Sequence, residues 1–302
     1  MEPENPKPGL ISRTRGKIRR LMDPLGKALS FMMEKKKPEI IFEADSQFNH
    51  ITISELDGVR TMYLGLNAEE AETAISLVNP DAPIFEYPGL LFISLVLRPK
   101  ARRIVMLGLG GGFIPRLCQR YLPDHKLTVV EIDPLVVDLA GVYFGFTPGG
   151  NVQVEIADGQ EYLAKLPPKS QDLIWLDAFN GDYIPSHLAT RDFMRLNRRI
   201  LTKEGLLAQN LHSSRMADYL KQLDLINKIF EEPALAFCGD RCANTIVINP
   251  NGPEPIPRER KDLARAAREF GHLIGPYNLL EEINKQEKLP DLAKTKLDRY
   301  SK

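Results

Sequence analysis

The run Arg103-Ile-Val-Met-Leu-Gly-Leu-Gly-Gly-Gly-Phe113 decides the fold of this chain. Its apolar part, Ile104–Leu107, is typical of a buried parallel strand. The glycines that follow let the backbone approach a ligand closely at the start of a helix. A dinucleotide fingerprint requires Gly-x-Gly-x-x-Gly, but Phe113 occupies the position of its third glycine. The run therefore predicts a strand, a ligand-binding loop and a helix, and it disfavours a nicotinamide oxidoreductase.

Strands and helices alternate regularly after this loop, which is typical of a parallel sheet with crossover helices. Apolar runs predict further strands at 127–131, 152–156, 172–177 and 206–211. Beyond a predicted helix over 216–230, short strands at 234–237 and 245–248 are joined too tightly to be parallel. Five parallel strands and a C-terminal antiparallel hairpin predict an α/β, Rossmann-like fold of the AdoMet-dependent methyltransferase type, with a mostly parallel seven-stranded sheet.

Composition divides the chain into four predicted regions. They are a basic leader (1–39), a small β-hairpin domain with linking helices (40–98), a ligand-binding catalytic domain (99–250) and a polar, helical tail (251–302). Asp57-Gly58 between two β-rich runs is a strong hairpin signal. Helices are predicted over 68–77 and 87–97.

Charge and cysteine content exclude several classes of protein. Forty basic and forty acidic residues give a formal net charge of zero, so no nucleic-acid partner is expected for the whole chain. The basic leader suits contact with an anionic surface, but we favour a solvated arm that packs on its own body or on a subunit partner. No apolar run is long enough to span a bilayer. Three scattered cysteines form no disulfide framework, so a cytoplasmic protein is predicted.

Acidic residues follow the predicted strands at the edge where open α/β sheets bind ligands. Glu131 is placed to accept both hydroxyls of an adenosine ribose, whereas Asp133 is better placed to cap the next helix. Asp158, before Gly159, is placed to accept the exocyclic amine of adenine, or else it is a turn or N-cap residue. Asp177 is placed to deprotonate or orient an attacking amine, with a helix cap as the alternative.

For the other reactive residue types we favour structural roles over functional ones. His187 and His212 follow the same edge, but a lone histidine is more often a structural residue. Cys238 and Cys242 are too few for a zinc site, and no metal is expected. Trp175, inside a strand, is predicted to be core.

Six motifs, in order and at matching spacing, resemble the spermidine synthase (polyamine aminopropyltransferase) family over roughly residues 46–250. They are Leu107–Gly112, Val130–Pro134, Ala157–Leu163, Asp172–Asp177, Thr190–Met194 and Leu201–Gln209. The resemblance implies a homodimer that binds AdoMet or decarboxylated AdoMet, and an amine that attacks a carbon beside the sulfonium. By position, Glu131 would hold the ribose, Asp158 the adenine, and Asp177 would be the base. The remaining predicted donor-binding residues are Gly108, Gly110, Gly111 and Gly159.

The chain departs from the family pattern at several positions. Gly111 stands where the family's glycine loop carries an aspartate that holds the propylamine end of decarboxylated AdoMet. Asn180 stands at the second aspartate of the strand-four motif, and Asp182 is a candidate for the missing catalytic acid. The predicted substrate-binding residues are Glu72, Glu86, Tyr87 and Asn180.

Charge gives these departures a meaning. Decarboxylated AdoMet and polyamines are polycations, so their pocket needs carboxylates. Loss of one carboxylate at Gly111 removes a charged hydrogen bond worth about 1.5–3 kcal/mol, which shifts relative affinity toward AdoMet itself. The leading interpretation is an aminopropyltransferase acting on a small amine. The alternatives are an AdoMet-dependent methyltransferase and a non-catalytic nucleoside-binding module that acts through its basic leader.

Overall fold

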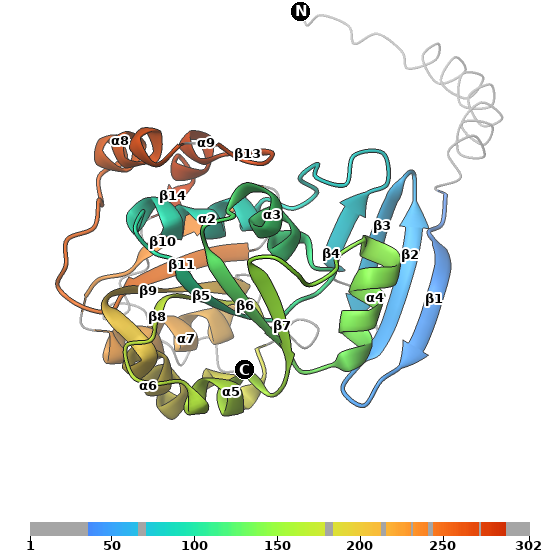
Figure 1. Ribbon diagram of the computed structural model, residues 1–302, viewed down its shortest axis with the longest axis horizontal. Coiled ribbons are helices and arrows are strands. Elements are labelled where there is room, and N and C mark those ends of the chain that lie inside the picture. Colours follow the sequence, from blue (N-terminus) through green and yellow to red (C-terminus); the bar gives the residue numbers. More distant parts are fainter. Residues whose placement is uncertain are drawn as a thin grey trace, which may run out of the picture. The chain divides into compact units, whose positions relative to one another are not determined.

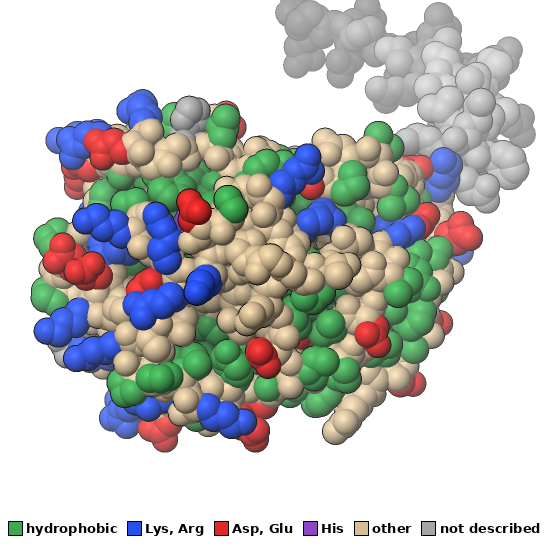
Figure 2. Space-filling view, viewed as in Figure 1, with side chains coloured by type: hydrophobic (Ala, Val, Ile, Leu, Met, Phe, Trp, Pro, Cys, Tyr) green, Lys and Arg blue, Asp and Glu red, His purple; other side chains and the backbone are tan. Residues whose placement is uncertain are grey.

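The computed structural model describes residues 36–65, 71–178, 184–212, 216–230, 232–240, 244–271 and 273–287. Four predicted features lie outside the described residues: the leader up to residue 35, the site residues Asn180 and Asp182, Cys242, and the tail beyond residue 287. Within the described ranges, no helix combines the length and the apolar character that crossing a membrane requires. Basic and acidic side chains are mixed over the face drawn in Figure 2.

The N-terminal sheet has the strand order β1-β2-β3-β4. Its strands are β1 (Glu39–Asp45), β2 (His50–Leu56), β3 (Val59–Leu64) and β4 (Ala71–Ser76). Strands β2 and β3 form the predicted hairpin, and Asp57 and Gly58 have φ values of 47° and 78°. A type I′ turn requires positive φ at both central residues, which explains the Asp-Gly pair.

The helix predicted over 68–77 is wrong in its described part, where the chain forms β4. The alanines and glutamates of this segment favour a helix in isolation. Antiparallel pairing with β3 and the burial of Thr73, Ala74 and Ile75 outweigh that local preference. This correction matters for function because β4 carries Glu72 and Thr73 to the cavity described below.

The central sheet contains eight strands in the order β14-β10-β11-β9-β8-β5-β6-β7. The parallel strands are β5 (Arg103–Leu107), β6 (Lys126–Glu131), β7 (Val152–Ile156), β8 (Gln171–Leu176) and β9 (Leu201–His212). Beyond β9 the strand pairs are antiparallel: β9 with β11 (Asn244–Pro250), β11 with β10 (Leu235–Cys238), and β10 with β14 (Gln286–Glu287). The predicted α/β fold with its C-terminal hairpin is confirmed. The sheet has one strand more than predicted because β14 pairs with β10.

Helices cover both faces of this sheet (Figure 1). One layer contains α2 (Tyr87–Leu97), α3 (Phe113–Tyr121), α4 (Pro134–Phe144), α8 (Arg260–Phe270) and α9 (Leu279–Ile283). The other contains α5 (Gly159–Lys165), α6 (Arg191–Ile200) and α7 (Met216–Ile229). Side chains of β5 alternate between the layers: Ile104 and Met106 pack into the first, Val105 and Leu107 into the second.

Helix α2 is buried along its whole length, from Pro88 to Leu97. An apolar sequence on every side of a helix requires cover on every side. The sheet covers one side of α2, and α8 and α9 of the C-terminal region cover another. Helices α8 and α9 of the predicted C-terminal tail are therefore packed against α2. Trp175, as predicted, is core: it is fully buried, and its Nε1 donates to Ser94 Oγ of α2 at 3.0 Å.

Candidate active site

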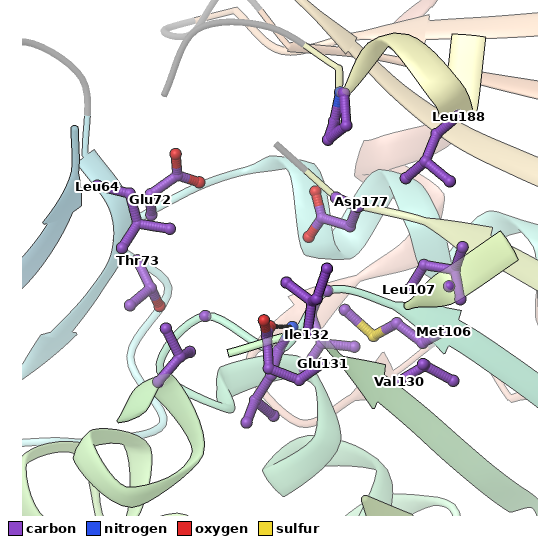
Figure 3. Close-up of a pocket in the computed structure, with 18 of the residues that line it drawn as sticks. Leu64, Glu72, Thr73, Met106, Leu107, Val130, Glu131, Ile132, Asp177 and Leu188 are labelled. Carbon is purple, nitrogen blue, oxygen red and sulfur yellow. Dashed lines mark hydrogen bonds between the residues drawn. The ribbon is translucent and has the colours of Figure 1, made fainter. Parts of the chain in front are cut away.

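A cavity lies at the carboxyl ends of β5, β6, β7 and β8, where β4 of the N-terminal sheet and the start of α2 meet it (Figure 3). Parallel strands bring the residues that follow them to one edge of a sheet, so the acids predicted from the sequence converge here. The predicted site residues that line the cavity are Glu72, Tyr87, Gly108, Gly110, Glu131, Asp158, Gly159 and Asp177. Neither Gly111 nor Glu86 lines it, for reasons given below.

The glycine loop lets the backbones of neighbouring strands approach. Gly108 has a φ of 94°, and a Cβ atom there would lie 2.2 Å from the Asp177 carbonyl oxygen. Gly159 is similarly confined, because a Cβ would lie 2.7 Å from a methyl group of Leu107. These glycines bring the start of α5 and the end of β8 against the loop after β5.

The space beside Gly111 is filled by neighbours. A Cβ atom at this position would lie 2.7 Å from Cγ2 of Thr73 and 2.8 Å from the ring of Phe144. Thr73 comes from β4 and Phe144 from the end of α4. Thr73 and Phe144 thus leave no room for an aspartate side chain at Gly111, the position that departs from the family pattern.

We expect the Gly111→Ala variant to be less stable than the wild type by about 1–3 kcal/mol, because an extra methyl group overpacks this contact. Urea unfolding measures the difference. Gly141→Ala is a matched control on α4, since a Cβ there would meet only the Phe146 carbonyl oxygen, at 3.5 Å. Equal unfolding free energies for Gly111→Ala and the wild type would contradict the packing account.

Glu131 ends β6 with its carboxylate held by two backbone donors. Oε2 accepts from the Leu109 N–H at 2.9 Å, and Oε1 accepts from the Asp133 N–H at 3.0 Å. Burial raises the pKa of this carboxyl group, and the two backbone bonds oppose that effect. Asp133 caps α4 by accepting from the Leu135 N–H at 3.0 Å. A carboxylate has about four acceptor positions, so Glu131 can still accept from a further donor.

Asp158 caps α5 and also lines the cavity. Its Oδ1 accepts from the Glu161 N–H at 2.9 Å, and its Oδ2 lies 2.9 Å from Nε2 of His187. Asp158 is therefore a helix cap, as the alternative interpretation predicted, and it also lines the cavity. His187 lines the cavity, whereas His212 ends β9 and is not among the lining residues.

Asp177 follows β8 and receives two side-chain hydrogen bonds. Asn210 Nδ2 donates to its Oδ1 at 2.9 Å, and the Tyr87 hydroxyl donates to the carboxylate. Burial raises the pKa of Asp177, while these two bonds lower it. Burial, with the nearby charges of Asp177 and Glu72, raises the pKa of Tyr87 well above its ordinary value, so the hydroxyl keeps its proton.

Sequence reasoning missed Asn210. The signal was present: Gln209 and Asn210 are polar residues that interrupt the apolar, buried run 205–211 of β9. Asn210 is itself oriented, because Asn244 Nδ2 of β11 donates to its Oδ1 at 3.1 Å. The antiparallel hairpin at the end of the domain thus supports the carboxylate at the cavity.

Glu72 reaches the cavity through an irregularity in β4. Met62 of β3 pairs with Thr73, but the next residue, Tyr63, pairs with Ala71, so Glu72 is an extra residue in the ladder. An extra residue of this kind redirects a side chain that regular alternation would turn away. Figure 3 shows the Glu72 and Asp177 carboxylates turned toward the same space from opposite sides.

Glu86 lies elsewhere, despite being adjacent to Tyr87. Its Oε1 is 3.0 Å from Nζ of Lys285, and both side chains are almost fully buried beneath the C-terminal region. Glu86 and Tyr87 are consecutive at the start of α2, so their side chains leave the helix in different directions. Tyr87 faces the cavity and Glu86 faces Lys285.

Comparison with known proteins finds a family model and several proteins that are similar to the central part of the chain. Residues 90–233 match the family model described as Spermine/spermidine synthase domain. This central part of the chain is similar to a spermine/spermidine synthase domain. The resemblance that the sequence motifs predicted is thereby confirmed.

Two polyamine aminopropyltransferases are among the similar proteins. The one from Vibrio vulnificus is 35% identical over 185 residues, which are 60% of this chain and 62% of that protein. The one from Chromobacterium violaceum is 28% identical over 244 residues, 78% of this chain and 91% of that protein. A human eEF1A lysine and N-terminal methyltransferase is 31% identical over 119 residues, 36% of this chain and 17% of that protein. The chain therefore spans under two thirds of the Vibrio relative.

Solved structures show the same fold. A spermidine synthase in complex with the transition state analogue AdoDATO superposes with a TM-score of 0.69 at 21% identity, covering 86% of this chain and 89% of that one. Human methyltransferase-like protein 13 in complex with SAH gives a TM-score of 0.53 at 24% identity, covering 70% and 96%. At these identities the likeness shows the fold alone.

Proposed function

We propose that this protein transfers an aminopropyl group from decarboxylated AdoMet to a small amine. The observation that carries the proposal is the pair of carboxylates, Glu72 and Asp177, that face one cavity already lined by Glu131 and Asp158. A cationic donor and a cationic acceptor both need carboxylates to replace the water they lose on binding. The relatives named polyamine aminopropyltransferase support the same reaction.

The donor is proposed to bind along the glycine loop. Glu131 would accept the ribose hydroxyls and Asp158 the exocyclic amine of adenine. Gly108, Gly110 and Gly159 would let the backbone lie close to the nucleoside. Glu72, on the opposite wall, would supply the negative charge that Gly111 does not. Asn180 and Asp182, which lie outside the described residues, are retained as proposed acceptor-binding and catalytic residues.

The proposed reaction is a single displacement. The lone pair of a neutral amine attacks the carbon beside the sulfonium, a carbon–nitrogen bond forms, and the carbon–sulfur bond breaks with its electrons passing to sulfur. The sulfonium becomes a neutral thioether, and the new ammonium group gives its proton to Asp177. Hydrogen bonds from Tyr87 and Asn210 hold that carboxylate toward the cavity.

Calorimetric titration with decarboxylated AdoMet and, in parallel, with AdoMet tests the proposed donor. We expect the decarboxylated form to bind more tightly. Glu72→Gln should weaken its binding by about 1.5–3 kcal/mol, the value of a charged hydrogen bond, and should affect AdoMet less. Glu155→Gln on the exposed side of β7 removes the same charge away from the cavity and serves as control. Tighter binding of AdoMet would contradict the proposal, and so would binding of neither donor.

Methyl transfer from intact AdoMet is the second candidate. It is favoured by the filled space beside Gly111, because that space cannot hold a further carboxylate for the donor. The similarity to a human methyltransferase supports it as well. A preference for AdoMet in the same titration would establish this candidate in place of the first.

The pH dependence of the reaction follows from Asp177. Because burial raises its pKa, the base is protonated and inactive at low pH, and kcat/KM should rise as the carboxyl group loses its proton. Asn210→Ala removes a bond that favours the charged form, so the acidic limb of the profile should move to higher pH. An acidic limb at the same pH in both proteins would contradict the assignment.

The proposal also includes a homodimer formed through the N-terminal sheet, as the family resemblance implies. Exposed apolar side chains in this region, Ile40, Phe48 and Leu56, support it. Sedimentation at micromolar concentration should give the mass of a dimer, and a monomer would contradict this part of the proposal.

A further inference from the structure

The C-terminal segment 273–287 holds the short stretch 85–89 from which Tyr87 reaches the active site. This segment lies outside the matched family domain. Tyr277 Oη donates to the carbonyl oxygen of Phe85 at 2.7 Å. Lys285 Nζ donates to Oε1 of Glu86 at 3.0 Å. Both residues that precede Tyr87 are thus bound by the C-terminal segment.

The contact at Glu86 is a buried group of charges. Lys285 Nζ lies 3.0 Å from Glu86 and 2.9 Å from Oε2 of Glu282, and the three side chains are 10–14% exposed. Burial alone would lower the pKa of Lys285, but the bonds to Glu282 and Glu86 raise it, so the ammonium group stays charged. A buried cation between two carboxylates permits few alternative arrangements, because any displacement leaves a charge unpaired.

Close packing strengthens the same contact. A Cβ atom at Gly89 would lie 2.4 Å from the ring of Tyr277 and 3.1 Å from the Glu282 carboxyl carbon. The Tyr277 ring also meets Phe92 edge to face, with 6.1 Å between the ring centres. This packing therefore prevents the first turn of α2 from sliding along or rotating about its axis relative to the C-terminal segment.

Tyr87 is the first residue of α2, and its hydroxyl donates to Asp177. Glu86, the residue that would cap the helix, makes no side-chain cap bond. Its carboxylate binds Lys285 instead, so the C-terminal segment fixes the start of the helix. We propose that Lys285 and Tyr277 are positioning residues: by fixing residues 85–89 they place the Tyr87 hydroxyl on the carboxylate of Asp177. The catalytic part of this inference rests on the proposed function.

Three variants test the inference in the full-length protein. Lys285→Met removes the buried cation, Lys285→Arg keeps a charge there, and Tyr277→Phe keeps the ring but loses the bond to Phe85. Lys228→Met is the control, since Lys228 pairs with Asp224 on the exposed side of α7. The position of Tyr87 is read from the ring resonance of ¹³C-labelled tyrosine, assigned with Tyr87→Phe, and catalysis from kcat and the donor KM.

Lys285→Met and Tyr277→Phe are each expected to shift the Tyr87 resonance and to lower kcat by about ten- to a hundredfold, as for a misplaced catalytic group. The donor KM should stay unchanged, because residues of other elements hold the nucleoside. Lys285→Arg should recover part of kcat. Folded variants with a wild-type Tyr87 resonance and kcat would overturn the inference. If the wild type transfers nothing, the proposed function fails and the resonance alone decides the positioning role. Tyr277→Phe carries the test if Lys285→Met does not fold.

Discussion

Replacing Asp177 by asparagine is expected to lower kcat by about 10²- to 10⁴-fold, the usual contribution of a positioned general base. Asparagine has the same shape, and its one carbonyl oxygen can still accept a hydrogen bond, but it cannot take a proton from the attacking amine. Steady-state kinetics at saturating donor and amine measure the effect. The affinity for the donor should change little, because Glu131 and Asp158 come from other strands.

Asp138→Asn is a suitable control for this variant. Asp138 is an exposed residue of α4, and its replacement makes the same chemical change away from the cavity. Calorimetry with the Asp177→Asn protein checks that the nucleoside still binds. A wild-type kcat in Asp177→Asn would show that another group accepts the proton, and Asp182 would then be the next residue to replace.

Replacing Glu131 by glutamine is expected to weaken donor binding strongly. The charged bond to a ribose hydroxyl is worth about 1.5–3 kcal/mol, a factor of about 10 to 150 in Kd. Glutamine also disturbs the loop. Its amide nitrogen replaces one of the two carboxylate oxygens and cannot accept a hydrogen bond, so the N–H of either Leu109 or Asp133 loses its partner. Calorimetric titration measures the change.

The two carboxylate variants separate binding from chemistry. Glu131→Gln should raise Kd while kcat at saturating donor falls much less, and Asp177→Asn should do the reverse. Donor affinity in Glu131→Gln equal to that of the wild type would show that the ribose binds elsewhere, and the orientation proposed for the nucleoside would be wrong.

Those parts of the fold that depend on local pattern could be predicted from the sequence. The apolar runs at β5, β6 and β8 are long enough to identify buried parallel strands, and Asp57-Gly58 identifies the hairpin between β2 and β3. The sites of Glu131, Asp158 and Asp177 followed from the same rule, because residues after parallel strands meet at one edge.

Features that depend on distant segments could not be predicted. Strand β4 has the composition of a helix, and only its pairing with β3 makes it a strand. The two-residue strand β14 is too short to carry a pattern of its own. Glu86 and Tyr87 are adjacent in sequence, yet Tyr87 lines the cavity while Glu86 binds Lys285, about 200 residues away. Asn210 became a site residue only when β9 was placed beside β8.

The measurement that tests the central claim most directly is mass spectrometry of the acceptor after incubation with decarboxylated AdoMet and, separately, with AdoMet. Putrescine, as a simple diamine, is the acceptor, and Asp177→Asn protein is the blank. We predict a product heavier by one aminopropyl group with decarboxylated AdoMet, and none with the variant. A product heavier by one methyl group with AdoMet, and no aminopropyl product, would contradict the account.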